Sequence, residues 1–256
     1  MKRSRPAYSV RQDAVPDGVL KKQAKEIGAL LHEVDIYPDL PEHPNVSQQA
    51  QKENASLAIA LANAALSEQG RQLSADDIEL GIASCAWPGR FQHLHKDGVH
   101  WFLDSAHNEL SIPVAISWFD SLSKSVEKVN SNHPCRRILI FGHSSDRSTE
   151  RLVDVLLESS SKCGVKFDQV ILSSYNRYDI PIPESVANEQ LEFWQSRNLL
   201  IPIQHAITAD VAINMVKTLQ KNFPDTHFQV LVTGSAHLVG QSLGALGGEE
   251  LVLIAP

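Results

Sequence analysis

The sequence predicts an α/β fold, with a mostly parallel sheet covered by helices on both faces. From about residue 85 onward, short apolar segments alternate with longer amphipathic segments, which is the pattern of such folds. The apolar segment 99–104 ends on Asp104, and a histidine and an amphipathic helix follow within a few residues. Other apolar segments also end on Gly, Ser or Thr, at the rim where parallel sheets bind ligands.

Each element of this sheet follows from its own local pattern. Apolar residues from 112 to 129 recur on one helical face, which predicts a helix directly after the first strand. Pro113 falls in the first turn of that helix, where a missing N–H does no harm. The remaining predictions are, in chain order, strand 137–141, helix 149–159, strand 167–173, a loop and helix over 183–198, helix 209–222, strand 228–233, helix 236–246 and an apolar stretch over 251–254.

The first part of the chain, residues 1–84, predicts too few elements for a self-sufficient domain. Helices are expected over 19–27 and 54–66, and a strand over 30–36. So few elements cannot enclose much core. The helix 54–66 is apolar nearly all round, so we expect it to pack against a partner or to drive self-association. The second predicted domain spans residues 85–256.

Composition excludes several classes of protein. The net charge is −7 and is spread evenly along the chain, with no basic face, so neither nucleic acid nor a membrane surface is an expected partner. No apolar run approaches the ~18 residues of a transmembrane helix. The three cysteines lack C-x-x-C spacing, which disfavours structural zinc and a disulfide framework and makes a reducing compartment the default. We therefore expect a cytoplasmic protein. The basic residues 1–5 could begin a mitochondrial transit peptide, but Asp13 and Asp17 follow soon and favour a solvated terminus.

Three short motifs carry the most specific signal. They are Trp-Pro-Gly-Arg at 87–90 with Gln92, Leu-Asp-Ser-Ala-His-Asn at 103–108 with Ser111, and Leu-Val-Thr-Gly-Ser-Ala-His-Leu-Val-Gly at 231–240. In this order they resemble the motifs W-P-G-R-x-Q, L-D-G-A-H-[TN]-x-x-S and V-L-V-T-G-S-x-H-L-V-G of the folylpolyglutamate synthase C-terminal domain, a Rossmann-like domain of the Mur ligase superfamily. Ser105 stands where the family usually has Gly.

The resemblance extends upstream in weaker form. Residues 51–55 match the end of the family pattern G-[EH]-[FH]-Q-x-x-N-A, which lies late in the central ATP-binding domain. Residues 1–84 would then be a remnant of that α/β domain. No G-x-x-x-x-G-K-[ST] phosphate-binding loop occurs in the chain. The family's magnesium ligands would also lie upstream. We therefore expect a fragment, a shortened gene prediction or a truncated paralogue.

The resemblance implies a reaction and its participants. The family adds L-glutamate to the γ-carboxylate of tetrahydrofolyl-(poly)glutamate, using ATP and Mg²⁺, through an acyl phosphate. Such a site concentrates negative charge and needs cations, N–H donors and helix N-termini. We expect this chain alone to be incomplete. The alternatives are a catalytically inactive binding or interaction module, and a split enzyme whose other half is a separate chain.

The resemblance also assigns candidate residues on the nucleotide side. Asp104 would accept hydrogen bonds from ribose hydroxyls, as carboxylates do in dinucleotide sites. The alternative is an N-cap of the following helix. Arg90 would contact the nucleotide phosphates, which suit a guanidinium, or else be a surface arginine in a hinge. Asn54 would approach the adenine, or else cap its helix.

The candidate residues on the glutamate side are His107, Asn108 and Ser235. His107 is the expected catalytic residue, facing the phosphate or the incoming glutamate. Its alternative is a structural histidine bonded to a loop carbonyl. Ser235 and Asn108 would contact the glutamate, but each could instead cap a helix or brace a loop. A Ser-His-Asp hydrolase built on His143 and Asp146 is disfavoured because no G-x-S-x-G elbow occurs.

Overall fold

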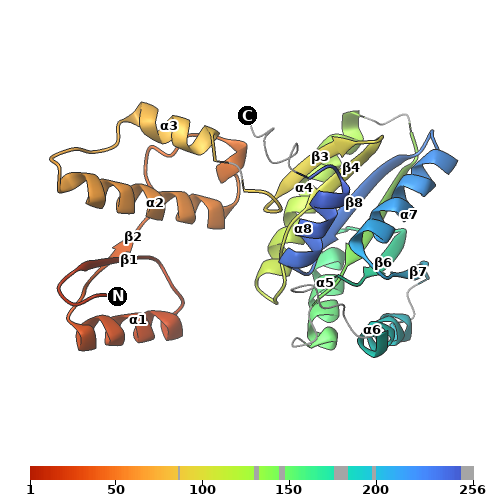
Figure 1. The fold of residues 1–256 in the computed structure, drawn as a ribbon, viewed down its shortest axis with the longest axis horizontal. Coiled ribbons are helices and arrows are strands. Elements are labelled where there is room, and N and C mark those ends of the chain that lie inside the picture. The colour runs from red at the N-terminus through yellow and green to blue at the C-terminus, as the bar shows by residue number, and fades with distance from the viewer. Residues whose placement is uncertain (86, 130–132, 144–147, 176–183, 198–199, 249–256) are drawn as a thin grey trace. The chain divides into compact units, whose positions relative to one another are not determined.

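The chain folds into two compact units, which a computed structural model describes for residues 1–85, 87–129, 133–143, 148–175, 184–197 and 200–248 (Figure 1). The first unit spans Met1–Ala86 and the second begins at Trp87 and runs to Ile254. No helix among the described residues is long and apolar enough to cross a membrane. The predicted apolar stretch 251–254 lies outside the described residues.

The second unit is built on a six-stranded sheet of order β3-β4-β8-β5-β6-β7. β3 pairs antiparallel with β4, and all the other pairs are parallel. This confirms the predicted α/β fold with a mostly parallel sheet. The strands, in sheet order, are β3 (Gln92–Lys96), β4 (Val99–Leu103), β8 (His227–Thr233), β5 (Cys135–Phe141), β6 (Gln169–Ser173) and β7 (Ile203–Ala206).

Helices cover the two faces of this sheet, so the second unit has three layers (Figure 1). Alternate residues of each buried strand point to opposite faces, as strand geometry requires. On β4, Trp101 packs into the core under α7 (Ala209–Asn222) and α8 (Ala236–Ala245), whereas Phe102 packs into the other core. That second core contains residues from α4 (Ser111–Val129), α5 (Thr149–Cys163) and α6 (Glu184–Ser196).

The first unit contains a pair of parallel strands and three helices. β1 (Pro6–Val10) and β2 (Leu30–Val34) are joined by α1 (Ala14–Ile27). After a 3-10 turn, η1 (Pro44–Val46), come α2 (Gln49–Ser67) and α3 (Ala75–Ala83). Its small apolar core is formed by Val46, Ile59, Ile78 and Ile82.

Three strands and one α-helix of the described residues were not predicted from the sequence: β1, β3, β7 and α3. The prediction of a single strand in the first part was therefore wrong. Two helices also begin earlier than predicted, α1 at Ala14 and α2 at Gln49. In α2 the Gln48 and Gln51 side chains form a reciprocal capping box, so helix formation begins before the apolar stretch.

Candidate functional site

The polar residues that follow the parallel strands meet at one edge of the sheet. β4, β8, β5 and β6 run parallel, so their carboxyl ends share that edge. Gly234, after β8, donates its N–H to the carbonyl of Ala106, after β4, at 2.8 Å. Gly142, after β5, donates to the carbonyl of Thr233 at 3.4 Å. The predicted edge is therefore confirmed for these residues, while residues 144–147 lie outside the described ones.

Glycine is required at two positions, Gly142 and Gly234, where the loops after β5 and β8 pass close to each other. Gly234 has φ +107°, and a Cβ there would lie 2.5 Å from the Gly142 carbonyl oxygen and 2.9 Å from the Phe141 ring. A Cβ on Gly142 would overlap the Ser173 carbonyl in turn. The backbones of three neighbouring loops therefore approach more closely than any side chain allows.

A tight turn at residues 87–91, here called the arginine turn, lies beside these loops. Arg90 donates its backbone N–H to the Trp87 carbonyl at 3.1 Å. Gly89 has φ +73°, and its Cβ would lie 2.6 Å from Cγ1 of Val239 on α8. Phe91 is also left-handed, with φ +47°, and its ring packs edge-on against Trp118 of α4 at 5.6 Å between centroids. Arg90 and Trp87 are exposed, whereas Gly89 between them is buried.

Asp104 lies buried between the arginine turn and the loop after β4. It is 1% exposed. Its Oδ2 accepts the Phe91 N–H at 3.0 Å, and its Oδ1 accepts the Ala106 N–H at 2.9 Å. Burial raises the pKa of this carboxyl above its ordinary value, and the Phe91 N–H and the Arg90 guanidinium act in the opposite direction.

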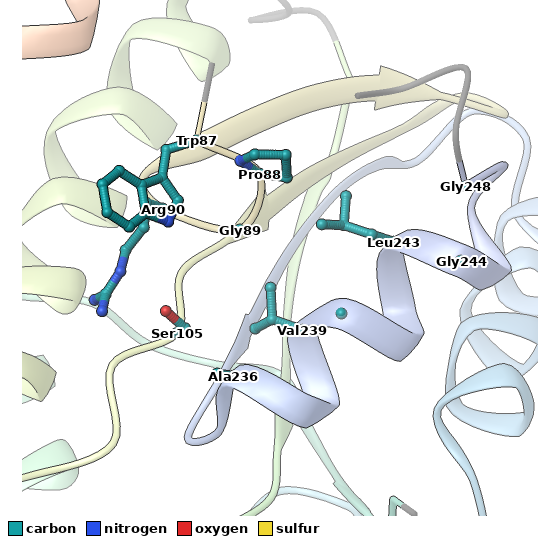
Figure 2. Close-up of a pocket in the computed structure, with 11 residues that line it drawn as sticks. Trp87, Pro88, Gly89, Arg90, Ser105, Ala236, Val239, Leu243, Gly244 and Gly248 are labelled. Atoms are coloured by element: carbon teal, nitrogen blue, oxygen red, sulfur yellow. The ribbon is translucent and has the colours of Figure 1, made fainter. Parts of the chain in front are cut away.

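A cavity of about 710 Å³ opens between the arginine turn and α8. Trp87, Arg90 and Ser105 line one side, and Val239 and Leu243 of α8 line the other (Figure 2). Its walls are mainly apolar, and Arg90 is the charged residue among those that line it. Cavities of this size and lining suit small organic ligands.

The comparisons with known proteins give one consistent family. The folylpolyglutamate synthase of Candida albicans is 30% identical over 291 aligned positions, covering 97% of this chain and 54% of the relative. That of Neurospora crassa is 29% identical and covers 96% of this chain and 51% of the relative.

Over nearly its whole length, this chain is therefore similar to folylpolyglutamate synthases. It spans about half the length of the curated relatives it matches. Among solved structures, folylpolyglutamate synthase from Mycobacterium tuberculosis, complexed with ADP and AMPPCP, superposes with a TM-score of 0.60 at 21% identity, covering 94% of this chain and 55% of that one. The likeness shows that the fold is shared. No family model matches the chain.

Three of the residues that the family motifs single out have local structural partners. His107 Nδ1 lies 2.8 Å from the Ser105 carbonyl, as the structural alternative expected. Asn108 Oδ1 accepts from the backbone N–H groups of Leu110 and Ser111, so it braces the start of α4. Ser235 is the N-cap of α8, and its Oγ accepts the His237 N–H at 3.2 Å. Their roles toward glutamate stay predictions.

For two residues the capping alternative is wrong. Asp104 does not cap α4, because that helix begins only at Ser111 and the Asp104 oxygens bind the N–H groups of Phe91 and Ala106. Asn54 does not cap α2 either, because the N-cap is Gln48. The Asn54 side chain is exposed in the first unit. Nucleotide binding by Asp104, Arg90 and Asn54 stays a prediction.

A divalent metal finds no set of ligands in the part of the chain that the structure describes. There, no group of three or more His, Cys, Asp or Glu side chains could hold a metal ion. Asp104, which precedes the cavity-lining Ser105, has both oxygens engaged by backbone N–H groups. The described residues therefore offer no metal site built from protein ligands alone, whereas the cavity and Arg90 fit an organic anion.

Sequence reasoning missed the partners that hold the site together. The Phe91 N–H, the Ala106 carbonyl and the Val239 side chain are contacts made through space, and no motif indicates them. One signal was available. Gln92 belongs to the Trp-Pro-Gly-Arg-x-Gln motif, and its Oε1 accepts the Gly89 N–H at 2.8 Å, so it closes the arginine turn.

Proposed function

We propose that this chain supplies the nucleotide- and glutamate-binding part of a ligase that adds glutamate to a folyl-(poly)glutamate at the expense of ATP. The observation that carries the proposal is the cavity beside Arg90 at the carboxyl edge of the sheet. Ligands of open α/β sheets bind at this edge. Similarity to folylpolyglutamate synthases supports the reaction, and the M. tuberculosis structure is complexed with ADP and AMPPCP.

The nucleotide would occupy the side of the site formed by the arginine turn. The Arg90 guanidinium is exposed and suits phosphate oxygens by charge and by its fork of N–H donors. Trp87, 70% exposed, offers an aromatic surface at the cavity. ATP would supply the phosphoryl group that activates the substrate carboxylate. Asn54 remains our candidate for the adenine.

Glutamate would occupy the side formed by the loops after β4 and β8. The contact with the Ser105 carbonyl requires His107 to donate from Nδ1, which leaves Nε2 of the neutral ring as a hydrogen-bond acceptor. An acceptor nitrogen can take the proton that an attacking amine releases. Asn108 follows His107 in the same motif, and Ser235 follows β8 at the same edge of the sheet. The N-terminus of α8 adds a favourable field for a carboxylate.

Magnesium enters this proposal only through the family. Because the described residues offer no ligand set, no step is assigned to a metal held by this chain. The chain also has no P-loop sequence. We therefore expect that residues 1–256, assayed alone, bind nucleotide without turning it over.

An interaction module without catalysis is the second candidate function. Apolar side chains of the first unit are exposed, with Val19 at 58%, Leu61 at 48% and Leu80 at 70%. Such surface favours association with a partner or with another copy. A stable monomer in size-exclusion chromatography at micromolar concentration would count against this candidate.

Calorimetric titration of ADP into the purified chain tests the proposal. We expect one site per chain, and we expect Arg90→Ala to weaken it by about tenfold or more, the worth of a charge-assisted hydrogen bond. Arg136→Ala is the matched control, because Arg136 lies on β5 near the opposite end of the strands and stacks on Phe223. No binding by the wild type, or equal losses in the two variants, would contradict the proposal.

The reaction itself is tested by glutamate incorporation. The chain alone should incorporate no labelled glutamate into tetrahydrofolate in the presence of ATP and Mg²⁺. Adding a P-loop-containing N-terminal half, taken from a full-length relative, should restore incorporation. Steady glutamate incorporation by the chain alone would refute our expectation that the chain is incomplete. If no glutamate is incorporated even with the N-terminal half added, the interaction module is favoured.

A further inference from the structure

The arginine turn is held in a conformation that it would not adopt by itself. Two of its residues, Gly89 and Phe91, have φ of +73° and +47°. For a bulky residue such as Phe91, the left-handed region is unfavourable and persists only where surrounding contacts enforce it. Something in the structure must therefore hold this turn.

Two hydrogen bonds from the segment that follows β4 hold it, one on each side of Arg90. The Ser105 N–H donates to the Gly89 carbonyl at 3.0 Å, and Asp104 Oδ2 accepts the Phe91 N–H at 3.0 Å. The other oxygen of Asp104 accepts the Ala106 N–H at 2.9 Å. One buried carboxylate thus joins the arginine turn to the loop after β4.

We propose that Asp104 is a positioning residue, which fixes the direction of the Arg90 side chain by holding the Phe91 backbone in its left-handed conformation. This inference rests on the proposed function, because Arg90 is taken to bind the nucleotide. Its content differs from the prediction drawn from the motif, in which Asp104 itself grips the ribose. A carboxylate that is 1% exposed and engaged by two N–H groups acts on the ligand through Arg90.

The burial of Asp104 fits this role. An ionised carboxylate in an apolar environment is costly unless hydrogen bonds satisfy its oxygens. Here each oxygen has an N–H donor, and the Arg90 guanidinium is a favourable charge nearby. Arg90 and Asp104 are therefore coupled through the backbone at Phe91 and through their charges.

A double-mutant cycle with ADP tests the proposal. Asp104→Asn preserves the shape of the side chain but turns an NH₂ group toward one of the two N–H donors. We expect it to weaken ADP binding by about tenfold, the worth of one charge-assisted hydrogen bond. Because Asp104 acts through Arg90, the double variant with Arg90→Ala should bind no more weakly than Arg90→Ala alone. Losses that multiply to about a hundredfold would show that Asp104 contacts the nucleotide itself and would overturn the proposal.

Amide hydrogen exchange in the nucleotide-free chain separates this proposal from the proposed function. The Phe91 N–H should exchange at least about ten times faster in Asp104→Asn, since its acceptor is weakened. Asp120→Asn is the matched control: it removes the same charge from a pair with Lys124 on α4 and should leave exchange at Phe91 and ADP binding unchanged. Unchanged exchange in Asp104→Asn would overturn the positioning role. A different result would separate the two proposals. If the wild type does not bind ADP but the Phe91 N–H still exchanges faster in Asp104→Asn, then Asp104 holds the turn as proposed and nucleotide binding is rejected.

Discussion

Ionisable groups at the two ends of the same sheet have contrasting surroundings. At the carboxyl end of β4, a buried carboxylate, Asp104, is surrounded by N–H donors and lies beside an exposed guanidinium. Near the amino end, imidazole rings gather on the face that α4 covers. His93 and His95 of β3 and His227 of β8 all approach His100 of β4, with ring centroids 4.1 to 5.2 Å apart.

The imidazole cluster is held together by groups that favour neutral rings. His93 Nε2 lies 3.0 Å from His100 Nδ1, and that contact is a hydrogen bond only if one of the two nitrogens carries a proton and the other does not. On the other side, Gln229 donates from Nε2 to the Ser123 carbonyl and lies 3.2 Å from His227 Nε2.

A hydrogen bond from Arg137, which is itself paired with Glu127, fixes the orientation of the Gln229 side chain. The Arg137 Nε–H donates to Gln229 Oε1 at 3.0 Å, and the guanidinium pairs with Glu127 at 2.6 Å. The amide NH₂ must then face the ring, so His227 Nε2 accepts and its ring is neutral.

The comparison shows how one sheet can separate binding from stability. The carboxyl end gathers N–H groups and a cation, which is an arrangement for an anion. At the other end, the imidazole rings are neutral, and they contribute to holding β3 on the sheet. We therefore expect mutations at the first end to change ligand affinity or loop packing, and acid to weaken the second.

The largest effect should come from filling the space between the loops of the carboxyl end. Gly234→Ala would place a methyl group against the Gly142 carbonyl at a φ that alanine resists, and should cost about 3 kcal/mol or more of unfolding free energy. Urea unfolding followed by tryptophan fluorescence measures this, because all four tryptophans lie in the second unit.

Gly240→Ala in α8 is the matched control for that substitution. No atom lies within 4 Å of its added Cβ, and Gly240 is inside a helix. It should stabilise the unit by up to about 1 kcal/mol, the usual gain from Ala in a helix interior. Equal stability of the two variants would show that the loops do not pack as described.

A smaller effect should follow acidification of the amino end. Burial, together with the neighbouring imidazoles, lowers the pKa of His93 to about 4 and of His100 to about 3, from an ordinary value of 6.5. The unfolded chain therefore takes up protons first. The stability that the neutral rings provide is complete above pH 6.5 and is lost progressively as the pH falls toward 4 and then 3.

His100→Phe tests this explanation, because it keeps a stacked ring but cannot titrate. Between pH 7 and pH 4.5 the urea midpoint of the second unit should fall less in this variant than in the wild type. His32→Phe is the control, since His32 stacks on Tyr8 in the first unit. An identical pH dependence of wild type and His100→Phe would rule out the cluster as its cause.

Much of the sheet could be predicted because its signals are local. The helix after β4 was found from its apolar periodicity, and the polar residues at the strand ends were placed at one edge by the rule for parallel strands. β3 was missed because its sequence is polar, with two histidines and a lysine. Asp97-Gly98, both with positive φ, was the hairpin signal that could have revealed it.

The site was predictable in its residues but not in their roles. The motifs pointed to Asp104, His107 and Arg90 in one region, and the structure brings Asp104 and the Arg90 turn together. That Asp104 holds the Phe91 backbone depends on two segments meeting in space, which no spacing along the chain encodes. The same is true of the Ala106 carbonyl that receives the Gly234 N–H.

The central claim, that a nucleotide binds at the cavity beside Arg90, is tested most directly by the tryptophan indole N–H signals in a two-dimensional NMR spectrum. Trp87 is 70% exposed and lines the cavity, whereas Trp101, Trp118 and Trp194 are buried in the cores. On titration with ADP, the Trp87 signal should move, with the concentration dependence seen by calorimetry, while the three buried signals stay nearly fixed. A Trp87 signal that does not move while calorimetry reports bound ADP would place the nucleotide elsewhere and contradict this account.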